Sequence, residues 1–299
     1  MQNPSNKATL IGLSSILIWA SLVAVVKLIT EALTPISGIA LIYSFSAICI
    51  LCLSGFPKIK QMPKKYLWGC GALFVSYEIL FLCSVALSKS HEQVMIIAMI
   101  NYLWPPLTIV MSILAKQLNY RYSVILGFFI SVFGLLLVVN PDILNLKKMH
   151  QVLSQNPVAY AFALIGAVVW PCYNVFTKKY AEGHNAVPLF FLIATLMLWI
   201  IHFISHETFI VPDFSLGLAI VLIGGLIGIS YNNWNYSLQF GNIKLLILAT
   251  YFIPIFSSLL SMMILGFQPE QGFWIGTCLV TLGALICWKS TWQVSHIRS

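Results

Sequence analysis

Long uncharged windows are the feature that most constrains how this chain folds. Only 8% of its 299 residues are charged, and long, largely apolar stretches separate these residues. Each stretch has about the 20 residues that a helix needs to cross a hydrocarbon layer roughly 30 Å thick. Hydrophobic residues make up 60% of the chain, which leaves too few polar side chains to cover the surface of a water-soluble protein. The sequence therefore predicts an all-α integral membrane protein that spans a lipid bilayer.

Ten transmembrane helices are predicted, five in each half of the chain. The third contains an acidic residue and the sixth ends against two lysines, but both are apolar enough to count as spans. The ten predicted spans are residues 8–26, 32–57, 66–88, 93–115, 122–141, 158–177, 187–205, 214–236, 245–269 and 271–288.

The two halves repeat the same landmarks, which predicts an internal duplication. Four residues recur 149 positions further on: Tyr102, Pro105, Gly127 and Gly134 reappear as Tyr251, Pro254, Gly276 and Gly283. Because each half has an odd number of spans, the second half enters the bilayer from the opposite side. We therefore expect two inverted five-helix repeats, residues 1–141 and 158–299, joined by a linker at 142–157. Such repeats place a substrate site at their interface near mid-membrane, here a central cavity.

The basic residues predict the orientation, since cytoplasmic loops carry an excess of lysine and arginine. With a cytoplasmic amino terminus, eleven basic residues lie inside and three outside. The inner set is Lys7, Lys58, Lys60, Lys64, Lys65, Lys116, Arg121, Lys178, Lys179, Lys289 and Arg298, and the outer set is Lys89, Lys147 and Lys148. We expect both termini in the cytoplasm. The net charge of +8 is thus a topology signal, and no nucleic-acid partner is predicted.

Glu78 is the first candidate for chemistry, because it lies near the middle of the third span. An unpartnered ionised carboxylate there costs several kcal/mol, with estimates from about 3 to over 10. Two interpretations fit. Either Glu78 faces a watery cavity, where it binds a substrate ammonium group or cycles a proton, or it is protonated and hydrogen-bonded to a neighbouring helix. Tyr77 and Phe81 lie one helical turn apart beside it and are predicted to border the same cavity.

Two matched prolines, Pro105 and Pro254, interrupt the fourth and ninth spans. Proline removes a backbone donor and kinks a helix, which frees carbonyl groups that a cavity can satisfy. The pair therefore indicates hinges or substrate-facing bends, with simple helix packing as the alternative. The side chains ahead of these prolines that we predict to face substrate are Asn101, Tyr102, Trp104 and Tyr251.

The sixth span places Trp170, Tyr173 and Asn174 on one stripe, and the matching stripe after Trp19 in the first span is apolar. This difference between the copies favours the three second-copy residues as cavity residues. At the end of the eighth span, residues 231–236 read YNNWNY. An aromatic belt at the cytoplasmic membrane surface explains its tyrosines and tryptophan without any ligand.

Glycines seven apart give the fifth and tenth spans a small-residue face each, through Gly127 and Gly134 and through Gly276 and Gly283. Such faces allow close helix packing, either within one chain or between the subunits of a homodimer.

No cofactor or metal site is predicted. His202 and His206 stand four residues apart, but no third ligand accompanies them. An intramembrane enzyme is a further hypothesis, but the sequence has no paired carboxylates, no His-Glu-x-x-His motif and no nucleophile elbow.

The chain resembles the drug/metabolite transporter superfamily in its ten-helix EamA-type branch, and within it the bacterial aromatic amino acid exporters. The resemblance covers nearly the whole chain and rests on the two five-helix halves, the NYLWP run at 101–105 and the YFIP run at 251–254. It implies export of small molecules across the bacterial inner membrane by alternating opening of a central cavity. It also implies an aromatic cage, which here falls on Tyr77, Phe81, Tyr102, Trp104 and Trp170.

An aromatic cage suits both an aromatic amino acid and a flat organic cation. Two transporter hypotheses therefore stay open: an exporter of phenylalanine, tyrosine and tryptophan, and an efflux carrier for other small amphipathic metabolites or organic cations. The energy source is open too. Glu78 either couples export to protons or plays no such part in a carrier that runs down the substrate's own gradient.

Overall fold

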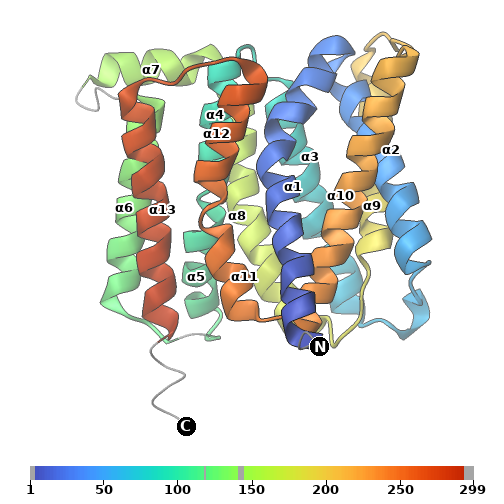
Figure 1. Cartoon of the computed structure of the whole chain (residues 1–299), viewed down its shortest axis with the longest axis horizontal. Helices are drawn as coiled ribbons and strands as arrows, with labels where there is room; N and C mark the ends of the chain where they lie inside the picture. Colours follow the sequence, from blue (N-terminus) through green and yellow to red (C-terminus); the bar gives the residue numbers. More distant parts are fainter. Residues whose placement is uncertain (1–3, 118, 141–144, 293–299) are drawn as a thin grey trace.

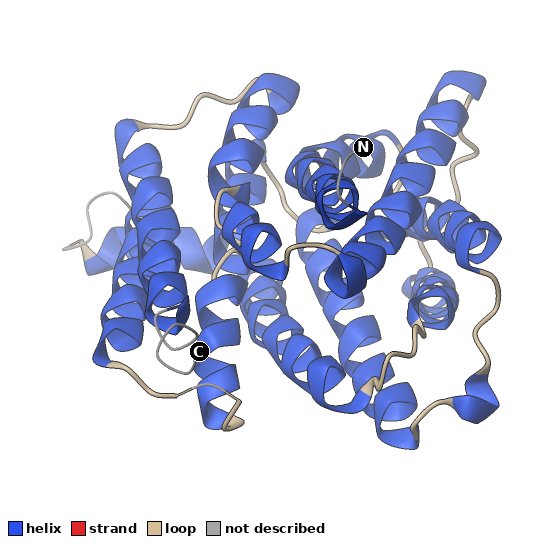
Figure 2. Ribbon diagram, turned by 60° about the horizontal axis from the view of Figure 1, so that its bottom comes forward, coloured by secondary structure: helices blue, strands red, loops and turns tan. Residues whose placement is uncertain are grey.

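The computed structural model describes residues 4–117, 119–140 and 145–292, and every regular element among them is helical (Figure 2). The helices stand side by side in one bundle, and α7 (Leu146–Gln155) lies across one end of it (Figure 1). The other helices of the first half are α1 (Pro4–Ala32), α2 (Pro35–Ser54), α3 (Gly71–Ala86), α4 (His91–Asn101), α5 (Trp104–Leu114) and α6 (Tyr122–Val139). Those of the second half are α8 (Pro157–Tyr180), α9 (Val187–Ser205), α10 (Phe214–Phe240), α11 (Ile243–Thr250), α12 (Ile253–Leu265) and α13 (Gln271–Trp292).

Nine helices among the described residues are long and apolar enough to cross a membrane. One of the nine is α4 and α5 taken together, and another is α3 with the π-helical turn Lys65–Cys70 that precedes it. The remaining predicted span, 245–269, is divided between α11 and the shorter apolar helix α12. The prediction of an all-α, multi-pass membrane protein is confirmed.

The fourth and ninth predicted spans are broken rather than kinked, and proline explains where. Pro105 has no N–H to donate to the carbonyl of Asn101, four residues back, and α4 ends at that residue. Pro254 stands in the same relation to Thr250, where α11 ends. At each break, two residues separate the end of one helix from the beginning of the next. Both halves therefore carry a short break at the matched position.

The hydrogen bonds at the two breaks are also the same. The amide of Leu103 donates to the carbonyl of Ile100 at 3.2 Å, and the amide of Phe252 donates to that of Ala249 at 3.2 Å. Both are three-residue bonds that close a tight turn, in place of the four-residue bond of an α-helix.

The predicted linker contains the helix α7, although residues 142–144 at its beginning lie outside the described part. Asn145 caps α7, because its side chain accepts from the amide of Lys148 at 3.0 Å. Asn156 caps α8 by accepting from the amide of Ala159 at 3.4 Å.

Helices α6 and α13 pack through their glycines. A Cβ atom placed on Gly127 would lie 2.5 Å from the carbonyl oxygen of Gly283, and one on Gly134 would lie 2.6 Å from that of Gly276. Between the two contacts, the hydroxyl of Ser131 donates to the carbonyl of Val280 at 3.2 Å. The glycine faces therefore meet within one chain. Of the two alternatives for these residues, packing within one chain and packing between subunits, the structure shows the first.

Gly127→Ala tests this contact. We expect it to lower the free energy of unfolding by about 1 to 3 kcal/mol, because the added methyl group forces two backbones apart. Thermal denaturation of the detergent-solubilised protein measures the loss. Gly225→Ala in α10 is the control, since its Cβ would meet nothing within 4 Å. Equal melting temperatures of the two variants would contradict the packing described.

Candidate substrate cavity

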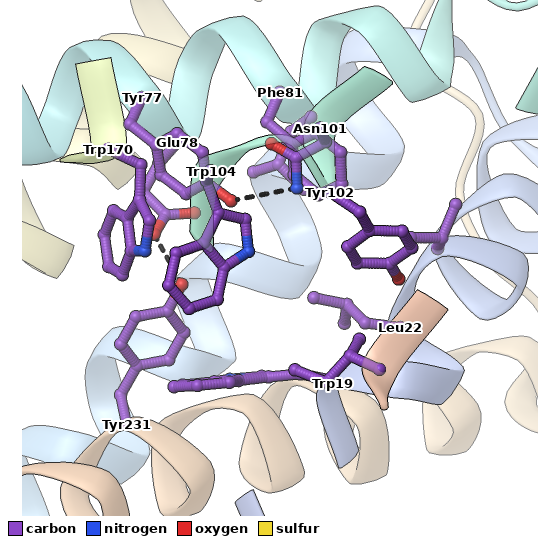
Figure 3. Close-up of a pocket in the computed structure, with 13 residues that line it drawn as sticks. Trp19, Leu22, Tyr77, Glu78, Phe81, Asn101, Tyr102, Trp104, Trp170 and Tyr231 are labelled. Carbon is purple, nitrogen blue, oxygen red and sulfur yellow. Dashed lines mark hydrogen bonds between the residues drawn. The ribbon is translucent and has the colours of Figure 1, made fainter. Parts of the chain in front are cut away.

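A small cavity of about 50 Å³ lies between the helices (Figure 3). Its wall is built from α1, α3, α8, α10 and the helix ends at both breaks. The lining residues are Trp19, Leu22, Val23, Tyr77, Glu78, Phe81, Leu82, Asn101, Tyr102, Trp104, Trp170, Tyr231 and Ile253.

Seven of the predicted site residues meet in this wall. They are Tyr77, Glu78, Phe81, Asn101, Tyr102, Trp104 and Trp170. The two predicted hinge prolines directly follow lining residues, since Pro105 comes after Trp104 and Pro254 after Ile253. The breaks therefore place two helix ends at the cavity.

Glu78 lies near the middle of its membrane span and is only 2% exposed. The hydroxyl of Tyr43 in α2 donates to its Oε2 at 2.5 Å, and the hydroxyl of Tyr231 in α10 donates to its Oε1 at 2.6 Å. These bonds supply much of what water would otherwise give a carboxylate. Glu78 therefore lines the cavity and is also hydrogen-bonded to two neighbouring helices, and both interpretations of its role stay predictions.

Aromatic rings form the rest of the wall around Glu78. The rings of Tyr77 and Trp170 are 4.5 Å apart between centroids, and those of Tyr77 and Phe81 stack at 5.8 Å with only 7° between their planes. Trp19 contacts Tyr231 edge-on at 5.3 Å. All three distances fall in the range at which ring pairs attract each other. The wall thus presents ring faces and edges to a planar ligand.

Three buried polar atoms of the wall have no hydrogen-bond partner among the described residues: Oδ1 of Asn101, Nε1 of Trp19 and the hydroxyl of Tyr102. The amide nitrogen of Asn101 does donate to the hydroxyl of Tyr77, at 3.4 Å. A buried polar atom without a partner costs free energy. An acceptor at Asn101, a donor at Trp19 and a hydroxyl at Tyr102 are therefore available to a bound molecule.

Comparison with known proteins now identifies the family. Over 286 residues, the chain is 35% identical to the aromatic amino acid exporter YddG of Escherichia coli (strain K12). The alignment covers 95% of this chain and 98% of that relative. The chain is 33% identical over 288 residues to the aromatic amino acid exporter YddG of Salmonella typhimurium (strain 14028s / SGSC 2262), covering 96% and 98%. Residues 157–288 match the EamA-like transporter family. The chain belongs to the EamA-like transporter family.

One solved crystal structure shares the fold of this EamA-like transporter. It superposes with a TM-score of 0.67 at 23% sequence identity and covers 98% of this chain and 99% of that chain. The likeness supports the arrangement of the helices and nothing further. Membership of this family confirms the prediction that the chain is a transporter and not an enzyme.

Three predicted site residues lie outside the lining. Tyr173 is behind the wall, where its ring stacks on Trp170 at 4.9 Å. Asn174, its neighbour in α8, is half-buried. Tyr251 belongs to a separate apolar cluster that includes Ile109 and Cys287. A substrate role for the three stays a prediction. Tyr173 contacts the cavity wall through its stacking on Trp170.

The lining residues that the sequence did not indicate are Trp19, Leu22, Val23, Leu82, Tyr231 and Ile253. The repeat held a usable signal for one of them, Ile253, because its counterpart Trp104 was predicted. Leu82 and Tyr231 are 149 positions apart, and so are Trp104 and Ile253, and both members of each pair line the cavity.

Tyr231 corrects the interpretation of the eighth span. The span was expected to end at residue 236, with Tyr231 in the aromatic belt, but α10 continues to Phe240. Tyr231 is therefore more than two turns inside the helix, is only 8% exposed, and reaches Glu78. Buried tyrosine hydroxyls usually find a polar partner, and here the intramembrane carboxyl group is that partner.

His202, considered above for a metal site, has a different neighbour. Its Nδ1 lies 3.7 Å from a carboxylate oxygen of Glu207, and that carboxylate also accepts from the amide of Ile36 at the start of α2, at 3.0 Å. The carboxylate of Glu207 therefore caps α2, and His202 lies beside it.

Tyr231→Phe tests the support of Glu78. Removing the hydroxyl takes away a hydrogen bond to a charged or polar buried group, which contributes about 1.5 to 3 kcal/mol. We expect a lower melting temperature and weaker substrate binding, both measured on the purified protein. The control is Tyr236→Phe, five residues further along α10 and 44% exposed, which should leave both unchanged. Wild-type behaviour of Tyr231→Phe would contradict the role assigned to this hydroxyl.

Proposed function

We propose that this protein exports aromatic amino acids across the bacterial inner membrane by alternating access. The observation that carries the proposal is the cage of rings around one buried carboxyl group, inside the membrane-spanning part of the bundle. An aromatic amino acid brings a ring that stacks on such walls and an ammonium group that pairs with a carboxylate. The names of the two relatives agree with this substrate class.

Each part of the substrate has a stated partner in the proposal. The ring stacks between Trp170 and Tyr77, whose own rings are 4.5 Å apart and must separate to admit it. The ammonium group binds Glu78, which keeps acceptor sites free beside the two tyrosine bonds. Stacking on a ring contributes roughly 0.5 to 1.5 kcal/mol beyond area burial.

The two broken helices supply the movement in this proposal. Each half has a break at the same position, with the same backbone bonds and a proline in the turn that follows. Residues at both breaks line the cavity, so bending there changes its opening. This supports two inverted repeats, residues 1–141 and 158–299, that rock around a common site.

The orientation belongs to the proposal as well. Helix α1 begins and α13 ends at the same end of the bundle, where the connection between α2 and α3 also lies (Figure 1). That connection and the start of α3's span carry four lysines, Lys58, Lys60, Lys64 and Lys65. By the excess of basic residues in cytoplasmic loops, this end faces the cytoplasm, and both termini are cytoplasmic.

Trp170→Ala tests the cage. Cells that overproduce phenylalanine should excrete more of it when the wild-type protein is present, and Trp170→Ala should abolish the difference, because the substrate ring loses its stacking partner. The control is Trp68→Ala, at a side chain that is 73% exposed, with expression of both variants matched by immunoblot. Unchanged excretion with Trp170→Ala, or no effect of the wild-type protein, would contradict the proposal.

Glu78→Gln tests whether this group also couples export to protons. If it does, phenylalanine transport in proteoliposomes depends on pH in the wild type and loses that dependence in Glu78→Gln, because the amide cannot exchange a proton. We expect this loss. Persistence of the full pH dependence in Glu78→Gln would show that Glu78 does not carry the coupling and would leave it a binding role only.

A further inference from the structure

The charges on the cavity wall are unequal. Among the described side chains that line it there is one carboxyl group, that of Glu78, and no lysine, arginine or histidine. An amino acid zwitterion carries one charge of each sign. The wall therefore offers an ionic partner to the ammonium group and none to the carboxylate.

The lysine one helical turn beyond the cavity is engaged elsewhere. Lys27 follows Val23 on α1 by four residues, but its Nζ lies 2.6 Å from the carbonyl oxygen of Ser88 and 3.4 Å from a carboxylate oxygen of Glu31. Both partners hold the ammonium group away from the lining residues.

The prolines remove backbone donors from the two helix N-termini at the cavity. Broken transporter helices often direct the backbone amides of such ends at an anionic group of the substrate. Here α5 begins with Trp-Pro-Pro and α12 with Ile-Pro, and proline has no N–H. The amides of Leu103 and Phe252, just before each helix, already donate to the carbonyls of Ile100 and Ala249.

The unpartnered polar atoms of the wall are all uncharged: Oδ1 of Asn101, Nε1 of Trp19 and the hydroxyl of Tyr102. Oδ1 of Asn101, a residue only 3% exposed, is an acceptor and lies on the side of the cavity that Glu78 occupies (Figure 3). An ammonium group can therefore find a charged and a neutral acceptor. The carboxylate is left with two neutral donors, the hydroxyl of Tyr102 and Nε1 of Trp19, whose ring lies across the cavity from Glu78 (Figure 3). Burying a charge without an ionic partner is costly, so the carboxylate adds little to binding.

We infer that the cavity recognises its substrate by the ring and the ammonium group and not by the carboxylate, so that primary aromatic amines are also ligands and cargo. The inference rests on the proposed function, because it assigns the substrate's groups to the same site. It names a class of compound, the decarboxylated aromatic amino acids, that this carrier moves in addition.

The test is a displacement series on the purified protein, which avoids the passive leak of amines through vesicles. Labelled phenylalanine is displaced by phenylalaninamide, by 2-phenylethylamine, which lacks the carboxylate, and by 3-phenylpropionate, which lacks the ammonium group. We expect the amide and the amine to displace half of the label at concentrations within about threefold of that of unlabelled phenylalanine. The half-displacing concentration of 3-phenylpropionate should be at least about tenfold higher, because its charge has no ionic partner in the wall. Labelled tyramine should also leave loaded vesicles faster with the protein than without it.

A variant pair assigns the preference to Glu78. In Glu78→Gln the tenfold difference between the amine and the acid should collapse, whereas Glu182→Gln, an exposed acid between α8 and α9, should keep it. Displacement by 3-phenylpropionate as strong as by phenylalanine would overturn the inference. Equal loss of affinity on removing either group would also overturn it, because the carboxylate would then be recognised as strongly as the ammonium group.

The series also separates this inference from the proposed function. If labelled phenylalanine binds and 3-phenylpropionate displaces it well, export of aromatic amino acids stands and the inference fails. If tyramine moves and phenylalanine neither binds nor moves, the proposed function fails, and recognition through the ammonium group is supported.

Discussion

A carboxyl group buried in the middle of a membrane-spanning helix must be compensated, and the rest of the site depends on how this is done. Glu78 receives one hydroxyl from α2 and one from α10, through Tyr43 and Tyr231. These two bonds tie three helices together at the depth of the cavity. They also leave acceptor capacity on the carboxyl group, so the group that is costly to bury is available to a ligand.

Two kinds of helix contact surround this centre. The glycine faces of α6 and α13 bring two backbones so close that a methyl group would not fit, which makes a rigid pair at one side of the bundle. The breaks before α5 and α12 have the opposite character, because proline leaves an interrupted hydrogen-bond ladder at the cavity wall. A bundle that combines a fixed pair with two matched breaks has a defined place to bend.

Much of the fold could be predicted from the sequence, because hydrocarbon thickness dictates the length of uncharged windows. Glu78 and the run from Asn101 to Trp104 were also predictable, since a charge or proline within such a window has few explanations. The partners of Glu78 were not. A span that is apolar on all sides gives no periodicity that tells which face meets the cavity, so Tyr43 and Trp19 look like ordinary membrane residues in the sequence. Tyr231 was assigned to the membrane surface, because nothing in the sequence shows that its side chain faces Glu78.

The comparison of the two copies was informative in one respect and misleading in another. The fixed displacement of 149 links lining residues such as Trp104 and Ile253. The extra polar groups of the second copy, however, do not reach the cavity, because Tyr173 lies behind Trp170 and supports its ring. The apolar first-copy residues Leu22 and Val23 line the wall instead. Differences between copies therefore report on packing as well as on specificity.

Photolabelling tests the central claim, that aromatic substrates bind beside Glu78, most directly. Purified protein is irradiated with 4-azidophenylalanine, and the labelled peptides are mapped by mass spectrometry with and without excess phenylalanine. The account predicts label on the cavity-facing residues of α3 and α8, above all near Tyr77 and Trp170, that phenylalanine removes. Displaceable label confined to other helices or to the surface would contradict it.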